Sequence, residues 1–382
     1  MLELADIVRV TRVDYETRHA RELLPSQRRA MTDIVRCRTP ALGGSVFRCD
    51  ECGTLEYAYH SCRNRHCPKC QDEREQEWLT AVRARMLPSD HYLVTCTLPA
   101  QLRTIAARHQ HVVYSALFHA AAAAVQTLAH DRRWIGGTPG IVSVLHTWTR
   151  TLEYHPHAHL IVTAGGLSAD GTTWVQPAHE RFLMPGRVLA PLVRRAMRAT
   201  LAKAGLLDAI PPSVWARHWV VHVQQIGRGD QALRYLARYV FHVALSNTRI
   251  DRFADGRVTF RYTHAETGET RRLTLPVDTF LHRFLQHVLP ARFVKIRYYG
   301  LLSPTARLKL EAARRILHTY AAALAPTAST PVPKTDPHLA ARSRAVASEN
   351  AATPQPALRS CRHCHRGVLR LVSVLARERG PP

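Results

Sequence analysis

Residues 152–162 read LEYHPHAHLIV, and this stretch decides both the expected fold and the expected chemistry. Apolar residues lie between and after the histidines of this run, and the run predicts a β-strand. Successive side chains of a strand point to opposite faces. His155, His157 and His159 then share one face, while Leu160 lies on the other face, toward the core. Three imidazoles spaced two residues apart favour a site for a divalent metal ion over a solvated strand face.

The segments around this strand mix strands and helices without the regular strand–helix–strand order of a parallel sheet. They predict an α+β domain with an antiparallel sheet over about residues 90–310. Strands are expected at residues 92–97, 141–148, 152–163, 215–225, 258–262 and 270–275, the last two as a hairpin. Helices are expected at residues 1–36 (with a break at Pro25), 71–87, 100–130, 187–206 and 230–246.

Residues 230–247, DQALRYLARYVFHVALSN, predict a helix that begins at Asp230. At about 100° per residue, its apolar side chains gather on one side. Tyr235 and Tyr239 lie one turn apart on the other side, with Arg238 at its margin. A tyrosine oxygen can attack a phosphodiester and hold the DNA end as a phosphotyrosine. Two surface tyrosines with polar tips are the alternative; the histidine strand and the charge of the chain favour nucleophiles.

The charge of the chain points to a polyanionic partner. Its 382 residues include 53 Lys and Arg against 29 Asp and Glu, a net charge of +24. This balance disfavours an enzyme for small-molecule substrates and favours nucleic acid. No stretch approaches the roughly 20 apolar residues of a membrane span, and Glu3, Asp6 and Arg9 are unlike a signal peptide. We therefore expect a cytoplasmic, nucleoid-associated protein without a membrane partner.

Six of the nine cysteines fall within residues 37–70. Four of them form two CxxC pairs, and two such turns facing each other supply the four thiolates of a structural zinc ion. The expected zinc ligands are Cys49, Cys52, Cys67 and Cys70.

Further possible ligands lie around these pairs. Cys37, Cys62 and His66 either complete a second zinc site or replace a cysteine of the pairs, and one zinc ion is the simpler interpretation. A third CxxC pair, Cys361 and Cys364, offers only two ligands and is a weak indication of a site.

Basic and aromatic side chains alternate in parts of the chain, as in proteins that bind single-stranded nucleic acid. Residues 281–310 hold six Lys or Arg and no acid. Cations contact phosphates and rings stack on bases; the alternative, ordinary helix and turn packing, is compatible with this. The expected DNA contacts are Arg63 and Arg65 among the cysteines, Arg238 on the tyrosine helix, and Arg292, Lys295, Arg297 and Tyr298 in the basic segment.

Three motifs stand in order along the chain: the cysteines of SCRNRHCPKCQ, then HPHAH, then YLARY. Together with LHTW and HVLPARFVKIRYYGLL they resemble the rolling-circle transposases of the insertion-sequence-91 family, over most of the chain. The resemblance implies an N-terminal zinc-binding domain and a two-tyrosine HUH nuclease domain with a ferredoxin-like or RRM-like antiparallel sheet. It also implies an enzyme that nicks single-stranded DNA at element ends, stays attached to the 5′ phosphate and frees a 3′ hydroxyl.

Residue by residue, the resemblance assigns His157 and His159 to the catalytic metal ion and Tyr235 and Tyr239 to the nucleophiles. Magnesium or manganese is expected because the substrate is a phosphate ester. The third metal ligand stays open between a further histidine of the strand and two glutamines before the tyrosine helix: His155, Gln224 and Gln225.

The expected domains are a helical and zinc-binding domain (1–88), the catalytic domain (89–310), a helix end with a linker rich in Ala, Pro, Ser and Thr (311–360), and a basic tail (361–382). Two other functions stay open. A plasmid replication initiator or relaxase would share the chemistry but act at an origin. A non-enzymatic zinc DNA-binding protein would leave the histidines and tyrosines without a role.

Overall fold

The computed structural model of the chain describes residues 2–70, 80, 82–179, 183–228, 231, 244–264, 266–324 and 359–378. It divides the chain into two units, Met1–Cys37 with Cys62–Tyr320 and Arg38–Ser61 with Ala321–Pro382. This grouping differs from the consecutive domains expected from the sequence. The described residues leave out most of the helix expected at 230–246, including Tyr235, Arg238 and Tyr239. They also leave out most of the helix expected at 71–87 and the linker from 325 to 358.

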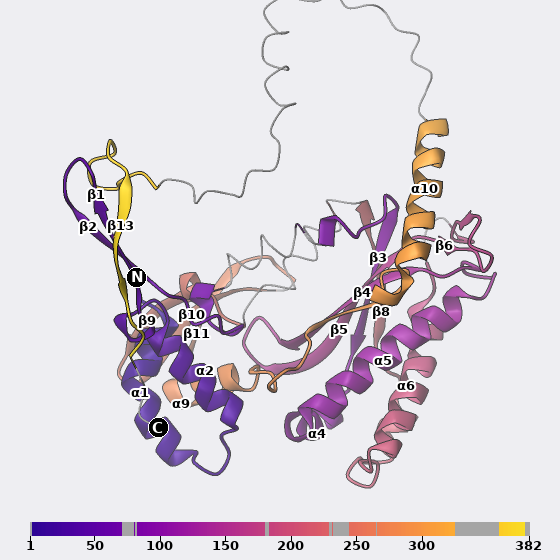
Figure 1. The fold of residues 1–382 in the computed structure, drawn as a ribbon. Helices are drawn as coiled ribbons and strands as arrows, with labels where there is room; N and C mark the ends of the chain where they lie inside the picture. Colours follow the sequence, from indigo (N-terminus) through magenta and orange to yellow (C-terminus); the bar gives the residue numbers. More distant parts are fainter. Residues whose placement is uncertain are drawn as a thin grey trace, which may run out of the picture. The chain divides into compact units, whose positions relative to one another are not determined.

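A five-stranded antiparallel sheet forms the centre of the larger unit (Figure 1). Its spatial order is β12-β4-β5-β3-β8, so the histidine strand β5 lies in the middle. The α+β class with an antiparallel sheet is confirmed. The strands are β3 (Asp90–Thr97), β4 (Gly140–Trp148), β5 (Tyr154–Thr163), β8 (Val221–Arg228) and β12 (Ile296–Gly300).

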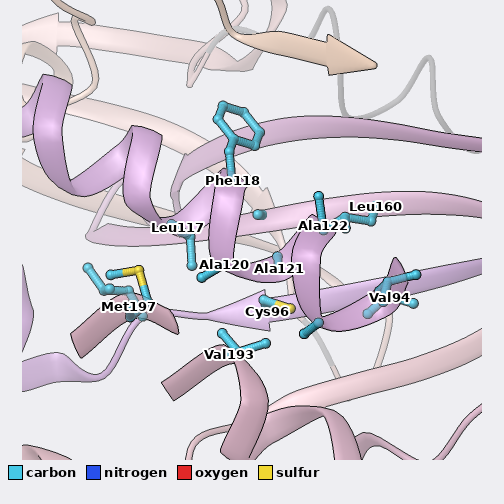
Figure 2. Packing of buried hydrophobic residues seen from close by; sticks show 14 of the residues in the cluster. Val94, Cys96, Leu117, Phe118, Ala120, Ala121, Ala122, Leu160, Val193 and Met197 are labelled. Carbon is cyan, nitrogen blue, oxygen red and sulfur yellow. The ribbon is translucent and has the colours of Figure 1, made fainter. Parts of the chain in front are cut away.

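Two long helices, α5 (Gln110–Ala129) and α6 (Gly186–Lys203), cover one face of this sheet and lie side by side (Figure 1). Short alanine side chains in α5 allow its backbone to approach the strands closely. Burying one large apolar side chain in such a layer stabilises the fold by about 1.5–3 kcal/mol. The residues packed here include Val94, Cys96, Leu117, Phe118, Ala120, Ala121, Ala122, Leu160, Val193 and Met197 (Figure 2).

Helix α5 corrects one expectation. The sequence predicts no stretch of membrane-spanning length, yet this helix of 20 residues is long and apolar enough to cross a membrane. Of its most apolar window, 67% is buried inside the structure. Because its apolar side chains pack on the sheet and on α6, α5 has the surroundings of a core helix.

The opposite face of the sheet carries the imidazoles and a smaller apolar cluster. Side chains alternate along β5, so His157, His159 and Ile161 share this face while Ala158 and Leu160 belong to the helical layer. The predicted direction of the histidines is therefore confirmed. The apolar cluster on their face consists of Val82, Met86, Leu93, Val142, Val144, Ile161 and Leu302, and Leu310 of α10 (Arg307–Leu324) packs against it.

A second core in the larger unit joins N-terminal helices to a three-stranded sheet of order β11-β10-β9. Pro25 begins the second helix, where its missing N–H costs no hydrogen bond. The predicted hairpin is confirmed, with Gly268 at φ +71° in its turn. The elements are α1 (Leu4–Arg18), α2 (Pro25–Arg36), β9 (Ile250–Ala254), β10 (Arg257–Thr263), β11 (Thr270–Pro276) and α9 (Val277–Leu285).

The smaller unit contains a three-stranded antiparallel sheet of order β13-β1-β2. Its strands are β1 (Gly44–Cys49), β2 (Leu55–Tyr59) and β13 (Leu369–Leu375). The C-terminal residues thus pair with β1 instead of forming the expected tail. Shorter elements of the chain are α4 (Arg103–Arg108), α7 (Ser213–Ala216), β6 (Gly166–Leu167), β7 (Trp174–Val175), and the 3-10 turns η1 (Pro40–Leu42), η2 (Pro68–Cys70), η3 (Ala100–Leu102), η4 (Asn247–Arg249) and η5 (Pro304–Ala306).

Candidate active site and metal centres

Three histidines converge on one face of the central sheet: His146 of β4, and His157 and His159 of β5. Their ligand nitrogens all lie within 4.8 Å of one another. The ring centroids of His157 and His159 are 4.7 Å apart, and those of His146 and His159 are 4.8 Å apart. The antiparallel register pairs His146 with His157 and so brings the third imidazole to the pair. This set of three nitrogen donors fits a divalent metal ion.

Hydrogen bonds and burial hold two of these imidazoles in the form that binds metal. His157 Nδ1 donates to the backbone oxygen of His155 at 2.7 Å, because a carbonyl oxygen can only accept, and Nε2 keeps its lone pair. Thr95 Oγ1 lies 3.0 Å from His159 Nδ1. Burial lowers the pKa of His157 to about 4 and that of His159 well below its ordinary value. Both rings are therefore neutral near pH 7, as metal ligands must be.

The structure does not bring His155 into this group. Its Nδ1 accepts a hydrogen bond from Arg103 Nη2 at 2.7 Å, and burial, then the charge of Arg103, lowers its pKa. The other two expected alternatives, Gln224 and Gln225, lie exposed on the edge strand β8. His146 is the third histidine of the group because its strand, β4, pairs with β5. The LHTW motif contained this residue, but only the register of the two strands shows that it reaches the site.

An aromatic ring and a cation pack behind His146. The His146 ring stacks on Trp148 with 4.8 Å between centroids, and Lys295 Nζ lies 5.1 Å from the Trp148 centroid. Burial, then the nearby charge of Arg65, lowers the pKa of Lys295 to about 7. These contacts limit the freedom of the Trp148 ring and, through it, of His146.

The residue after His146 is fixed separately. Thr147 Oγ1 lies 3.2 Å from Nδ1 of the buried His287, whose Nε2 donates to the Leu152 carbonyl at 3.2 Å. Burial lowers the pKa of His287 to about 4. Thr147, Trp148, His287 and Lys295 line a cavity of about 20 Å³, far below the roughly 300 Å³ of a small-molecule site. They support the strand and do not form a substrate pocket.

Four cysteines of the larger unit form a cluster. The Sγ atoms of Cys37, Cys62, Cys67 and Cys70 lie within 4.8 Å of one another, with Cys37 to Cys70 at 3.5 Å and Cys62 to Cys70 at 3.6 Å. Around zinc, with Zn–S bonds of about 2.3 Å, tetrahedral sulfur atoms are about 3.8 Å apart. The cluster fits a zinc ion.

The smaller unit holds a second cluster, of Cys49, Cys52, Cys361 and Cys364. Its Sγ atoms also lie within 4.8 Å of one another, with Cys49 to Cys364 at 3.6 Å and Cys52 to Cys361 at 3.7 Å.

These clusters correct the expected zinc ligands. The two N-terminal CxxC pairs do not share one site, because each faces cysteines from elsewhere in the chain. A CxxC spacing places two sulfur atoms on one turn, but the topology decides which turn lies opposite. His66 belongs to neither cluster: its Nε2 accepts a hydrogen bond from the backbone N–H of Leu289 at 3.1 Å.

Several of the expected DNA contacts are engaged within the protein. The Arg65 guanidinium donates to the carbonyls of Pro290 and Phe293. Arg297 donates to Ser115 Oγ at 2.9 Å and lies over the rings of Phe118 and Phe293, while Arg85 lies over the Tyr298 ring. Lys295 is half-buried, and the exposed members of the expected set among the described residues are Arg63 and Arg292.

A larger basic groove, of about 700 Å³, lies along α6 in the helical layer. Arg194, Arg195, Arg198 and Trp215 contribute to its lining. Arg194 is held by a hydrogen bond to the Arg217 carbonyl, whereas Arg195 and Arg198 are exposed. Guanidinium groups beside an aromatic ring suit a nucleic-acid strand.

A histidine triad on an antiparallel sheet, with a four-cysteine site in a strongly basic chain, defines a metal-binding protein of nucleic-acid metabolism. The family model described as "Putative transposase" matches residues 140–309, which include all three histidines. The model described as "Transposase zinc-binding domain" matches residues 7–98.

Two curated relatives carry the comparison further. The whole chain is 37% identical over 401 residues to "Putative transposase y4qJ" of Sinorhizobium fredii (strain NBRC 101917 / NGR234), covering 97% of that relative. It is 28% identical over 290 residues to "Transposase for insertion sequence element IS801" of Pseudomonas savastanoi pv. phaseolicola, covering 72% of this chain and 69% of the relative. No solved structure matches the chain. The chain belongs to the insertion-sequence-91 family of transposases.

Proposed function

We propose that this transposase nicks and rejoins single-stranded DNA at the ends of an insertion sequence through 5′-phosphotyrosine intermediates, with Tyr235 and Tyr239 as nucleophiles. The observation that carries the proposal is the triad of His146, His157 and His159 on one sheet face. In sequence the first tyrosine follows within ten residues of Arg228, the end of β8.

The proposed step exchanges one phosphate ester for another. The phenolic oxygen of a tyrosine bonds to phosphorus, and the bond from phosphorus to the 3′ oxygen breaks. The phenol loses its proton, the departing 3′ oxygen gains one, and the 5′ phosphate stays on the tyrosine. Attack by a 3′ hydroxyl on this ester rejoins the strand, and a second tyrosine allows two cleavages before the element is released.

The imidazoles would act on the scissile phosphate through a bound metal ion. A magnesium or manganese ion bound by them would supply positive charge to the phosphoryl oxygens and to the leaving oxygen. The protein's part is to keep His157 and His159 neutral by burial and to fix their rings through the His155 carbonyl and Thr95.

A structural zinc ion on Cys37, Cys62, Cys67 and Cys70 completes the proposed arrangement. The loop between Cys62 and Cys70 carries Arg65 and His66, which bind backbone groups of residues 289–293. That segment leads into β12, next to β4, so the zinc site supports the strand that carries His146. DNA contacts are proposed for Arg63, Arg292 and the groove along α6.

End-labelled single strands from the ends of the element and from a plasmid origin test the proposal. We expect cleavage of the element ends that requires magnesium or manganese and leaves a covalent protein–DNA adduct on a denaturing gel. Cleavage of origin strands alone would favour a replication initiator or relaxase. Binding without cleavage under any metal condition would favour a non-enzymatic DNA-binding protein.

A further inference from the structure

We infer that Cys49, Cys52, Cys361 and Cys364 bind a second structural zinc ion, which joins an N-terminal hairpin to the C-terminal end of the chain. The zinc-binding domain match ends at residue 98 and so does not include the two C-terminal cysteines. The inference is independent of the cleavage chemistry, because these cysteines belong to the smaller unit and the histidine triad to the larger one.

The distances between sulfur atoms fit a tetrahedral ion and not a disulfide. Cys49 and Cys364 lie 3.6 Å apart at Sγ, and Cys52 and Cys361 lie 3.7 Å apart. Sulfur atoms around zinc are about 3.8 Å apart, given Zn–S bonds of about 2.3 Å, whereas a disulfide bond is about 2.05 Å long. Both distances, each between cysteines of opposite turns, are therefore those expected between two ligands of one zinc ion.

The two turns have matching backbone structure. In each, the residue after the second cysteine has a left-handed conformation, Gly53 at φ +69° and His365 at φ +57°. In each, that residue's N–H donates to the carbonyl of the first cysteine, at 3.1 Å to Cys49 and 3.0 Å to Cys361. Two turns of the same form facing each other are the arrangement that four-thiolate zinc sites use.

Groups beside the cysteines also turn toward the sulfur atoms and tie the two turns together. The N–H groups of His363 and Gly367 donate to Sγ of Cys361 and Cys364, each at 3.4 Å. A Cβ at Gly367 would lie 2.3 Å from Cys49 Sγ, so this close approach requires glycine.

Asp50 lies in the turn of Cys49 and Cys52 and holds the chain next to the turn of Cys361 and Cys364, 318 residues further along the sequence. Its Oδ1 accepts a hydrogen bond from the N–H of Val368 at 2.7 Å, and its own N–H donates to the Val368 carbonyl at 3.1 Å. Arg370 lies 3.3 Å from its other carboxylate oxygen. Such contacts around a metal site orient its ligands.

The smaller unit also needs a cross-link. Among its described residues, the buried apolar cluster consists of Cys49, Cys361 and Leu369, while Leu371 and Val374 are 57% and 68% exposed. The described residues of this unit, 38–61, 321–324 and 359–378, number 48, and scaffolds below about 70–80 residues usually depend on a metal or disulfides. Zinc binding would therefore supply folding free energy to this sheet, and the sheet could not close until Cys364 had been synthesised.

The test counts zinc bound through thiolates in the full-length protein. We expect a thiol-specific mercurial to release two zinc ions per chain from the unsubstituted protein and one from Cys361→Ser/Cys364→Ser. The matched control, Cys96→Ala, removes a buried thiol outside both clusters and should still release two. One zinc ion in the unsubstituted protein, two in the double variant, or iron in place of zinc would overturn the inference.

Alkylation mapped by mass spectrometry gives a readout that needs no folded variant. As a chelator is added to the unsubstituted protein, Cys49, Cys52, Cys361 and Cys364 should lose protection together, at one chelator concentration. Alkylation of the C-terminal pair without any dependence on the chelator, while the N-terminal pair stays protected, would also overturn the inference.

Discussion

His146, rather than His155, is predicted to be the third ligand of the catalytic metal. Its ring nitrogen lies within 4.8 Å of those of His157 and His159, whereas His155 Nδ1 is occupied by Arg103. Changing a residue that only orients a ligand typically costs about 10–100-fold in metal affinity or activity. His146→Ala, which removes a ligand itself, should therefore cost more than about 100-fold, or about 2.7 kcal/mol.

The matched substitution is His155→Ala. The backbone oxygen that accepts the hydrogen bond from His157 Nδ1 is kept in this variant, so we expect less than about a tenfold loss. Thr95→Val, which removes the hydroxyl beside His159, should fall between the two. Manganese titration by calorimetry and single-turnover cleavage of a labelled strand measure affinity and rate, and thermal melting confirms that each variant is folded.

The order of these effects decides the assignment. Loss of manganese binding in His155→Ala, with normal binding and cleavage in His146→Ala, would show that the register of β4 and β5 does not build the site.

Three further predictions address the nucleophiles, the buried His287 and the basic groove. Tyr235→Phe/Tyr239→Phe should bind DNA but form no covalent adduct; an adduct that persists, mapped by peptide sequencing, would exclude these nucleophiles. The pKa of His287 is about 4 when folded and about 6.5 when unfolded. As the pH falls, the unfolded chain therefore binds the proton at a higher pH than the folded chain does. The free energy of unfolding is unaffected by this group above pH 6.5 and should fall by up to about 3 kcal/mol toward pH 4. Urea unfolding from pH 7 to 4 measures this, and His287→Gln should flatten the curve; an unchanged slope would contradict the cause. Arg195→Glu/Arg198→Glu should weaken single-strand binding and lower the salt slope by about 0.7 per lost phosphate contact, unlike Arg133→Glu, whose arginine pairs with Asp131 on the surface.

The elements that carry the site could be predicted because their signals are local. Alternation along β5 identified the strand and the common face of His157 and His159, and the strands expected at 92–97 and 141–148 differ from β3 and β4 by two residues or fewer. A turn that holds two cysteines is likewise visible from spacing alone. The tyrosine segment stays a prediction from the sequence.

The partners of these local motifs could not be predicted, because long-range topology selects them. Each CxxC turn leaves two metal positions open, and nothing in its spacing distinguishes the candidate cysteines elsewhere in the chain. The surroundings of the basic segment 281–310 also depend on the fold. Arg297 and Tyr298 point to opposite faces of β12, where Arg297 packs on Phe118 and Tyr298 packs against Arg85. The alternation of charged and aromatic side chains predicts a DNA-binding surface, but both faces of this strand are partly covered within the protein.

The histidine triad depends most strictly on topology, since a slip of one residue between β4 and β5 would turn the imidazole at 146 toward the helical layer. The apolar residues beside the ligands prevent that slip. Leu145 and Ala158 are paired across the strands and buried against α5, next to the paired His146 and His157. Such a slip would move Leu145 from the apolar layer to the polar face and would bury an imidazole among apolar side chains. Each of these two changes destabilises the fold. The core therefore fixes the register before any metal ion binds, and the three nitrogens converge because the apolar residues between them have a single stable arrangement.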